Sequence, residues 1–250
     1  MSLPVHLVDE LGSVRVGDLV EVTGDEAHHA VAVRRLAVGE RVVLTDGVGS
    51  AVTGTVATTG KRVFGVGVEE VSRVAHAEPR VTVVQALPKG ERGELAVEVL
   101  TEVGVDRIVP WAASRSVAVW RGERALKSRA KWSATAREAA KQSRRVWHPE
   151  VTALASTAEV CALVAGADTA LVLHEDATAP LSAITLPISG EVLVVVGPEG
   201  GVAPEELEAF TAAGAVSVRL GAEVLRTSTA GVVAVGALLA RTPRWGSQQP

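Results

Sequence analysis

The chain has 250 residues, 47% of them hydrophobic, which is enough to fill the core of one large or two modest domains. Its one cysteine, Cys161, excludes an internal disulfide and a metal cluster built on cysteine, and it is consistent with a reducing compartment. The formal net charge of −4 argues against a protein that binds nucleic acid over its whole surface.

The beginning of the chain has no basic region followed by an apolar stretch, so we expect no signal peptide. Its apolar runs, such as 192–196, are too short to cross a bilayer. We therefore expect a cytoplasmic protein without membrane spans.

Residues 1–72 alternate short apolar runs with Gly, Asp and Thr, a pattern typical of strands and turns. A helix at about 25–35 interrupts the strands, with Thr23 or Asp25 as its N-cap. These elements predict a small β-barrel. The polar stretch 73–79, which ends in proline, is the expected linker. The expected strands are 19–22, 41–45, 51–57 and 62–68.

From residue 80 to residue 244 strands and helices alternate, and several strands are almost continuously apolar. This pattern predicts an α/β domain in which helices cover both faces of a parallel sheet. Residues 245–250 are expected to form a loose tail. The expected strands are 81–86, 107–110, 169–174, 192–196 and 216–220. The expected helices are 93–103, 123–143, 204–213 and 228–241.

Two glycine-containing turns follow apolar strands near the end of the chain, at 197–201 (GPEGG) and at 221–229 (GAEVLRTST). Ligands of open α/β sheets bind beyond the carboxyl ends of the strands, and glycine lets the backbone approach a ligand closely. We therefore expect both turns to hold one ligand. The alternative is that 197–201 is only a turn before the helix that starts at Pro204. The glycine spacings of dinucleotide-binding and P-loop folds do not occur.

Both turns resemble the knotted loops of SPOUT-class S-adenosylmethionine-dependent RNA methyltransferases. Four further motifs narrow the resemblance to the 16S ribosomal RNA (uracil-N3) methyltransferases, and together they cover nearly the whole chain. These motifs are HHAVAVRR at 28–35, LPK at 87–89, TEVGV at 101–105 and EAAKQS-x-R at 138–145. The resemblance implies a SPOUT-type knotted parallel-sheet methyltransferase domain preceded by a small PUA-like, RNA-binding β-barrel, and a homodimer. The pattern of strands alone does not predict a knot.

The family resemblance implies methylation of N3 of a specific uridine in 16S rRNA of the small ribosomal subunit, without a metal. It also implies that three loops bind S-adenosyl-L-methionine, the first of them after the strand 169–173. Backbone groups of tight turns supply donors and acceptors at fixed geometry for such a ligand. The expected cofactor-binding residues are Leu173, His174, Glu175, Gly197, Glu199, Gly200, Gly201, Leu220, Gly221, Val224, Leu225, Thr227 and Thr229.

A guanidinium in the third loop could bind a substrate phosphate or a uracil carbonyl. Arg226 is the expected catalytic residue, because it would stabilise charge that develops on the uracil carbonyl oxygens. The alternative is a structural ion pair with Glu199 or Glu102. The family often has lysine where this chain has Val99, and glutamate where it has Ser228. We therefore assign no general base.

Basic residues are concentrated between residues 121 and 145, a segment that contains nine basic and two acidic residues. A local cluster of this kind is typical of a phosphate-binding surface, although a solvated helix face would look similar. The expected RNA-binding residues are Arg34, Arg35, Lys89, Arg137, Gln142, Arg144 and Arg145.

Two other functions remain possible from the sequence. A SPOUT ribose 2′-O-methyltransferase acting on tRNA would share the cofactor loops but would not explain the motif at 138–145. A non-catalytic ribosome-assembly protein would not need both glycine turns intact.

Overall fold

The computed structural model describes residues 3–246 of the chain. It divides into two compact units: residues 1–76 with 140–148, and residues 77–139 with 149–250. The predicted division into 1–72, a linker at 73–79 and 80–244 stays a prediction. The predicted second domain included residues 140–148, which here group with the first unit.

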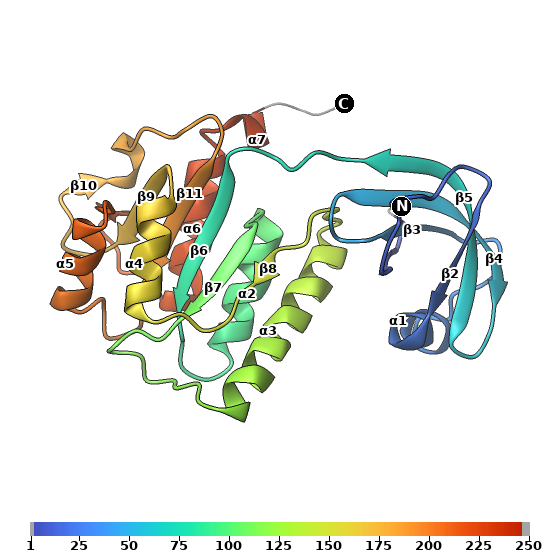
Figure 1. Cartoon of the computed structure of the whole chain (residues 1–250), viewed down its shortest axis with the longest axis horizontal. Helices are drawn as coiled ribbons and strands as arrows, with labels where there is room; N and C mark the ends of the chain where they lie inside the picture. Colours follow the sequence, from blue (N-terminus) through green and yellow to red (C-terminus); the bar gives the residue numbers. More distant parts are fainter. Residues whose placement is uncertain (1–2, 247–250) are drawn as a thin grey trace. The chain divides into compact units, whose positions relative to one another are not determined.

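The first unit is built on a five-stranded sheet in the order β1-β3-β4-β5-β2 (Figure 1). β1 pairs with β3 in parallel, and the other pairs are antiparallel. β1 and β2 are the two edges, so the expected PUA-like barrel is an open half-barrel. Bulges between β4 and β5 bend the sheet around its core. The strands are β1 (Val5–Leu7), β2 (Leu19–Thr23), β3 (Arg41–Thr45), β4 (Ser50–Thr59) and β5 (Val63–Arg73).

The predicted helix at 25–35 is α1 (Gly24–His28) followed by a π-helical turn (His29–Val33). Buried Ala27 and Ala30 pack into the core of the half-barrel with Phe64. Thr23 takes the N-cap position without a side-chain hydrogen bond to the helix.

Residues 140–148 pack into the first unit through Trp147. A Cβ at Gly49 would lie 2.5 Å from the Trp147 ring, so only glycine lets this strand end approach the indole. Trp147 Nε1 donates to the Val74 carbonyl at 2.9 Å, and its ring centroid lies 4.5 Å from that of His76. The segment therefore closes the end of the sheet where β4 begins.

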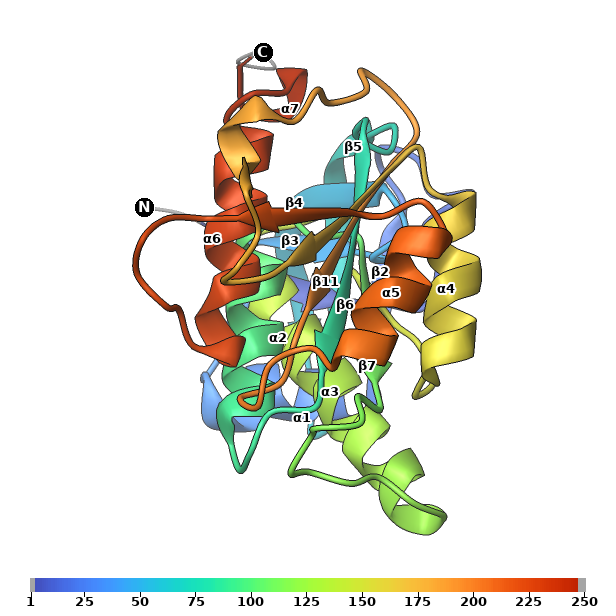
Figure 2. The same cartoon turned by 90° about the vertical axis from the view of Figure 1, so that its left-hand side faces the viewer.

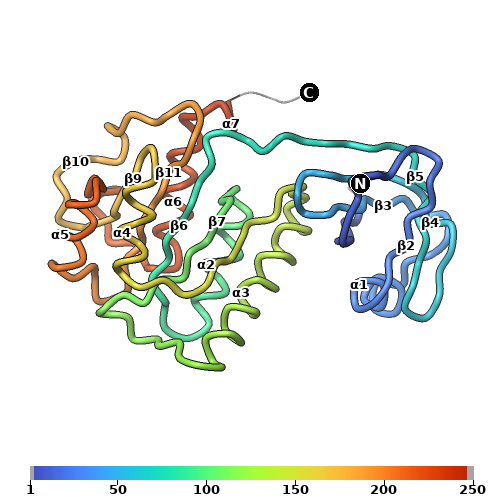
Figure 3. Tube along the Cα trace, in the orientation of Figure 1, coloured from blue at the N-terminus to red at the C-terminus, as the bar shows by residue number. Residues whose placement is uncertain are grey.

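The second unit has a seven-stranded sheet in the order β10-β12-β9-β11-β6-β7-β8, and all its pairs are parallel. β11 (orange) lies beside β6 (teal), although the two are far apart in the sequence (Figure 3). This confirms the predicted parallel sheet. The strands are β6 (Arg80–Ala86), β7 (Arg107–Trp111), β8 (Glu150–Val151), β9 (Thr169–Leu173), β10 (Ala179–Pro180), β11 (Glu191–Val196) and β12 (Val216–Arg219).

Helices cover both faces of this sheet (Figure 2). α2 (Arg92–Val103), α3 (Glu123–Gln142) and α6 (Thr227–Leu239) supply one core, which contains Trp132 and Val235. α4 (Thr157–Gly166) and α5 (Pro204–Ala212) supply the other, which contains Phe210. The strands between the two cores are buried on both sides, which explains their continuous apolar runs. A short 3-10 turn (Leu181–Ala183) follows β10.

The last described element is α7 (Pro243–Gly246), which Arg244 fastens to the second unit. Its guanidinium is 2.6 Å from the Asp106 carboxylate and donates to the carbonyls of Pro79 and Gly104. Residues 245 and 246, predicted as the start of a loose tail, therefore lie in a helix, and 247–250 are outside the described residues. Between residues 3 and 246, no helix has the length and apolar character needed to span a membrane. The knot stays a prediction.

Candidate active site

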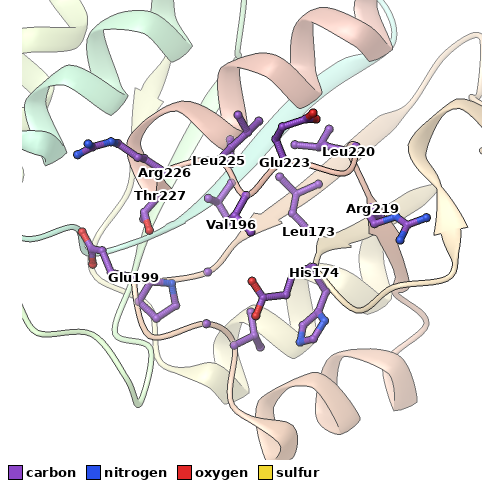
Figure 4. Close-up of a pocket in the computed structure, with 18 of the residues that line it drawn as sticks. Leu173, His174, Val196, Glu199, Arg219, Leu220, Glu223, Leu225, Arg226 and Thr227 are labelled. Carbon is purple, nitrogen blue, oxygen red and sulfur yellow. The ribbon is translucent and has the colours of Figure 1, made fainter.

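A cavity of about 530 Å³ lies at the carboxyl ends of three neighbouring strands, β12, β9 and β11 (Figure 4). Three loops line it, at 173–175, 196–202 and 219–227, together with Arg92 and Ala230. A volume of this size suits a small molecule or cofactor. The two glycine turns and the end of β9 therefore meet around one site.

The second loop needs glycine at two points for different reasons. A Cβ at Gly197 would lie 2.8 Å from Val202 Cγ2 and 3.3 Å from its backbone nitrogen. Gly201 has φ +74°, in the left-handed region that glycine adopts without strain. The turn thus presents its backbone to the cavity without side chains in the way.

Two neighbouring segments hold this loop from outside the cavity. The Lys89 N–H donates to the Glu199 carboxylate at 3.1 Å, and Arg115 Nη1 donates to the Gly200 carbonyl at 3.2 Å. Buried Glu206 accepts from the N–H groups of Ser114 at 2.8 Å and of Ala203 at 3.2 Å. Glu199 therefore ties two loops together, and Glu206 occupies the start of α5.

The first loop is shaped by His174. Its N–H donates to the Val218 carbonyl at 3.0 Å, which joins the loop to β12. Its Nδ1 accepts from the Asp176 N–H at 3.2 Å, so the proton of the neutral ring lies on Nε2. Figure 4 shows His174 at the cavity, where Glu175 also contributes to the lining.

The third loop leads into α6, whose first residue is held by a buried amide. Gln85, 1% exposed, donates from Nε2 to the Thr227 carbonyl at 3.3 Å. Leu220, Gly221, Val224, Leu225 and Thr227 all line the cavity. Thr229 does not, and its hydroxyl donates to the Arg226 carbonyl at 3.3 Å. Apart from Thr229, every predicted cofactor-binding residue lines the cavity.

Arg226 lies at the same end of the cavity as Glu199 (Figure 4). Its side chain is exposed, not enclosed by the apolar residues of the loop. Within the part of the chain that the structure describes, its guanidinium has no ion pair with Glu199, Glu102 or any other carboxylate. The described residues therefore supply no carboxylate for the structural ion pair that was the alternative role of Arg226.

Ser228 is buried beside the third loop and is not among the residues that line the cavity. The residue is 2% exposed, and its Oγ has no hydrogen-bond partner among residues 3–246. Val99 is half-buried on α2. Neither residue is placed to act as a base in the cavity.

The predicted RNA-binding residues are mostly exposed, with Arg145 half-buried. Lys89 and Arg137 belong to the second unit, and the other five belong to the first. Arg35 and Arg144 both have φ +58°, a left-handed conformation that is uncommon for residues other than glycine. Contact between these residues and RNA stays a prediction.

Comparison with known families identifies the class of protein. Residues 76–239 match the RNA methyltransferase domain, and residues 22–65 match the RNA methyltransferase PUA domain. The fold and the cavity are thus those of an RNA methyltransferase with a PUA domain.

Comparison with individual proteins narrows the class, and the chain belongs to the ribosomal RNA small subunit methyltransferase E family. It is 48% identical over 249 residues to the member from Mycobacterium bovis, and this match covers 98% of this chain and 93% of the relative. It is 31% identical over 229 residues to the member from Bacillus subtilis, covering 88% and 90%.

Two solved structures have the same fold over almost the whole chain. The methyltransferase E of Neisseria gonorrhoeae, bound to S-adenosyl methionine, is 26% identical with a TM-score of 0.85, covering 96% of this chain and 98% of that one. A methyltransferase from Legionella pneumophila, in complex with the same cofactor, is 26% identical with a TM-score of 0.87, covering 97% and 99%.

The sequence did not identify two arginines of this region. Arg92 lines the cavity and Arg115 holds the second loop. Arg92 follows closely on the LPK motif, which was a usable signal. Arg115 lies far from every motif in the sequence, and only the parallel sheet brings it to Gly200.

Proposed function

We propose that the protein transfers a methyl group from S-adenosyl-L-methionine to N3 of a specific uridine in 16S rRNA of the small ribosomal subunit. The observation that carries the proposal is the cavity that three loops form at the ends of β9, β11 and β12. Membership of the methyltransferase E family supports the substrate, and the cofactor bound in the Neisseria and Legionella proteins supports the donor.

The residues around the cavity fit this cofactor. Backbone groups of the glycine turns can bind its adenine and its polar ends, while Leu173 and Val196 offer apolar contact. Glu175 and Glu223 bring negative charge to a cavity that would receive a sulfonium cation. When bound, S-adenosylmethionine supplies an electrophilic methyl group.

The chain's own contribution is positioning and charge stabilisation. N3 of uracil must lose its proton as it attacks, so negative charge develops on the carbonyl oxygens of the base. Arg226 lines the cavity, its guanidinium forms no ion pair among residues 3–246, and it can donate hydrogen bonds to those oxygens. Alignment of N3 with the methyl group accounts for most of the remaining rate. We assign no general base.

A second copy of the chain would cover the exposed side of α6. This helix has no charged residue over Thr227–Leu239, and Val233 is 45% exposed on it. In the adjoining loop Val224 is 77% exposed. An apolar surface of this kind is typical of a contact between proteins. We therefore propose a homodimer, which sedimentation of the wild type and of Val233→Lys would test.

Methylation of small ribosomal subunits that lack the modification tests the proposed function. Wild-type protein with labelled S-adenosylmethionine should yield 3-methyluridine in digested 16S rRNA. Transfer to a ribose hydroxyl of tRNA would instead support the 2′-O-methyltransferase. Binding of subunits by a protein that binds no S-adenosylmethionine in a titration would support the ribosome-assembly protein. The proposed substrate also places the enzyme in the cytoplasm.

A further inference from the structure

Four cationic residues from three segments lie in or beside the cavity. Lys89 reaches Glu199 through its backbone, and Arg92 lines the cavity three residues later, at the start of α2. Arg115 comes from the segment after β7 and contacts Gly200. Arg226 comes from the third loop and lies at the same end as Glu199 (Figure 4).

The arginines of this group have no acidic partner within residues 3–246. Arg115 donates one N–H to the Gly200 carbonyl, and none of Arg92, Arg115 and Arg226 forms an ion pair with a described residue. Two other cations of the second unit are paired: Lys131 lies 2.7 Å from Glu94, and Arg244 lies 2.6 Å from Asp106. Unpaired guanidinium groups beside a cavity attract an anion from outside the protein.

A guanidinium is a planar fork of five donors that matches a phosphate oxygen pair, and it keeps its charge at every relevant pH. A nucleotide whose base enters the cavity carries a phosphodiester on each side. Arg92 and Arg226 line the cavity and Arg115 contacts its second loop, so three guanidinium groups are available to match that pattern of charge.

We propose that Arg92 and Arg115 bind the phosphodiester groups that flank the target nucleotide of the RNA. This inference rests on the proposed function, and it names the residues at the same site that hold the substrate backbone. Because Arg115 also donates to the Gly200 carbonyl, it links the RNA phosphate to the turn that lines the cofactor cavity.

The experiment compares Arg92→Gln and Arg115→Gln with Arg80→Gln. Arg80 is also an exposed arginine of the second unit, but it lies at the amino end of β6, whereas the cavity lies at the carboxyl ends of the strands. Binding of unmethylated small subunits is measured across a range of salt concentrations, with calorimetric titration of S-adenosylmethionine and thermal melting alongside.

Arg92→Gln and Arg115→Gln should each weaken subunit binding about three- to tenfold. Each should also reduce the magnitude of the slope of log affinity against log salt by about 0.7 to 1, because a complex with one fewer phosphate contact releases fewer counterions. Cofactor affinity should stay within about twofold for Arg92→Gln and fall somewhat more for Arg115→Gln. Arg80→Gln should match the wild type in subunit affinity and in salt slope.

If a glutamine variant has a lowered melting temperature, the corresponding lysine variant provides a second test. Arg92→Lys and Arg115→Lys should restore the salt slope and only part of the affinity, because a point charge lacks the fork. Wild-type affinity and slope in both Arg92→Gln and Arg115→Gln would overturn the inference, and so would an equal loss in Arg80→Gln. The wild type tests the function separately, since absent methylation by the wild type rejects the proposed function itself.

Discussion

Lys141 Nζ lies 3.0 and 3.2 Å from the two carboxylate oxygens of Glu26, which joins residues 115 apart in the sequence. His6 Nδ1 lies 3.2 Å from the same carboxylate, so it donates as the Nδ1–H tautomer. Burial raises the pKa of Glu26, but hydrogen bonds from His6 and Lys141 outweigh burial and lower that pKa from 4.5 to about 2. The carboxylate is therefore charged at neutral pH inside the first unit.

Acid should weaken the first unit through Glu26. Because its folded pKa is below its unfolded pKa, the carboxylate adds stability above pH 4.5, and this is lost as pH falls through about 2. The contribution is at most about 3 kcal/mol. Denaturant unfolding between pH 7 and pH 2 measures it. The Glu26→Gln protein should have a lower free energy of unfolding at pH 7 than the wild type. Below pH 4.5 its free energy of unfolding should depend less on pH. Parallel curves for the two proteins would contradict this.

Gly197→Ala should weaken S-adenosylmethionine binding about tenfold or more. The added Cβ would meet Val202 Cγ2 at 2.8 Å, so the turn must move, and a misfit of this kind costs about 1–3 kcal/mol. Calorimetric titration measures the loss. Gly166→Ala is the control, because nothing lies within 4 Å of its new Cβ. Wild-type affinity in a folded Gly197→Ala protein would remove the second loop from the cofactor site.

Arg226→Ala should lower single-turnover methylation of small subunits roughly a hundredfold, the scale of losing one preorganised donor. Because Arg226 is exposed and unpaired within the described chain, stability should change by less than about 0.5 kcal/mol. Arg226→Lys should recover only part of the rate. Near-normal turnover of the alanine variant, or loss of activity in proportion to unfolding, would exclude the catalytic role.

Arg144→Gly should raise the stability of the protein by about 0.5–1 kcal/mol. The N–H groups of Arg144 and Arg145 donate to the carbonyls of Lys141 and Ala140, a helix end that favours glycine at the φ +58° position. Arg137→Gly removes the same charge inside α3 and should destabilise by about 1 kcal/mol. Thermal melting distinguishes them, and a lower melting temperature for Arg144→Gly would contradict the assignment.

Local pattern was enough to predict most strands and helices. The strand Arg41–Thr45 has its predicted bounds, and the helix from Pro204 starts where its proline and acidic first turn indicate. The prediction missed α4, although Ser156 and Glu159 form a capping box that marks its start. It also missed the very short strands β1, β8 and β10, which carry too few residues for a periodic signal.

The remaining differences arise from contacts between distant segments. The signal for the glycine turns was local, so the cavity could be predicted from sequence. The exposure of Arg226 and the approach of Arg115 to Gly200 depend on how three strands and their loops assemble. The open half-barrel depends on which strands pair, and composition does not determine that pairing.

Trp147 and Lys141 belong to the first unit but are synthesised after most of the second unit's first half, so the first unit cannot complete its folding early in synthesis. A nascent chain that ends at residue 76 would leave the Gly49 end of β4 without its indole and Glu26 without its ammonium partner. Its sheet could collapse but could not finish packing until residue 148 had left the ribosome. A fragment that ends at residue 76 would therefore lack the contacts that complete the first unit. An isolated RNA-binding module requires residues 140–148 to be supplied with it.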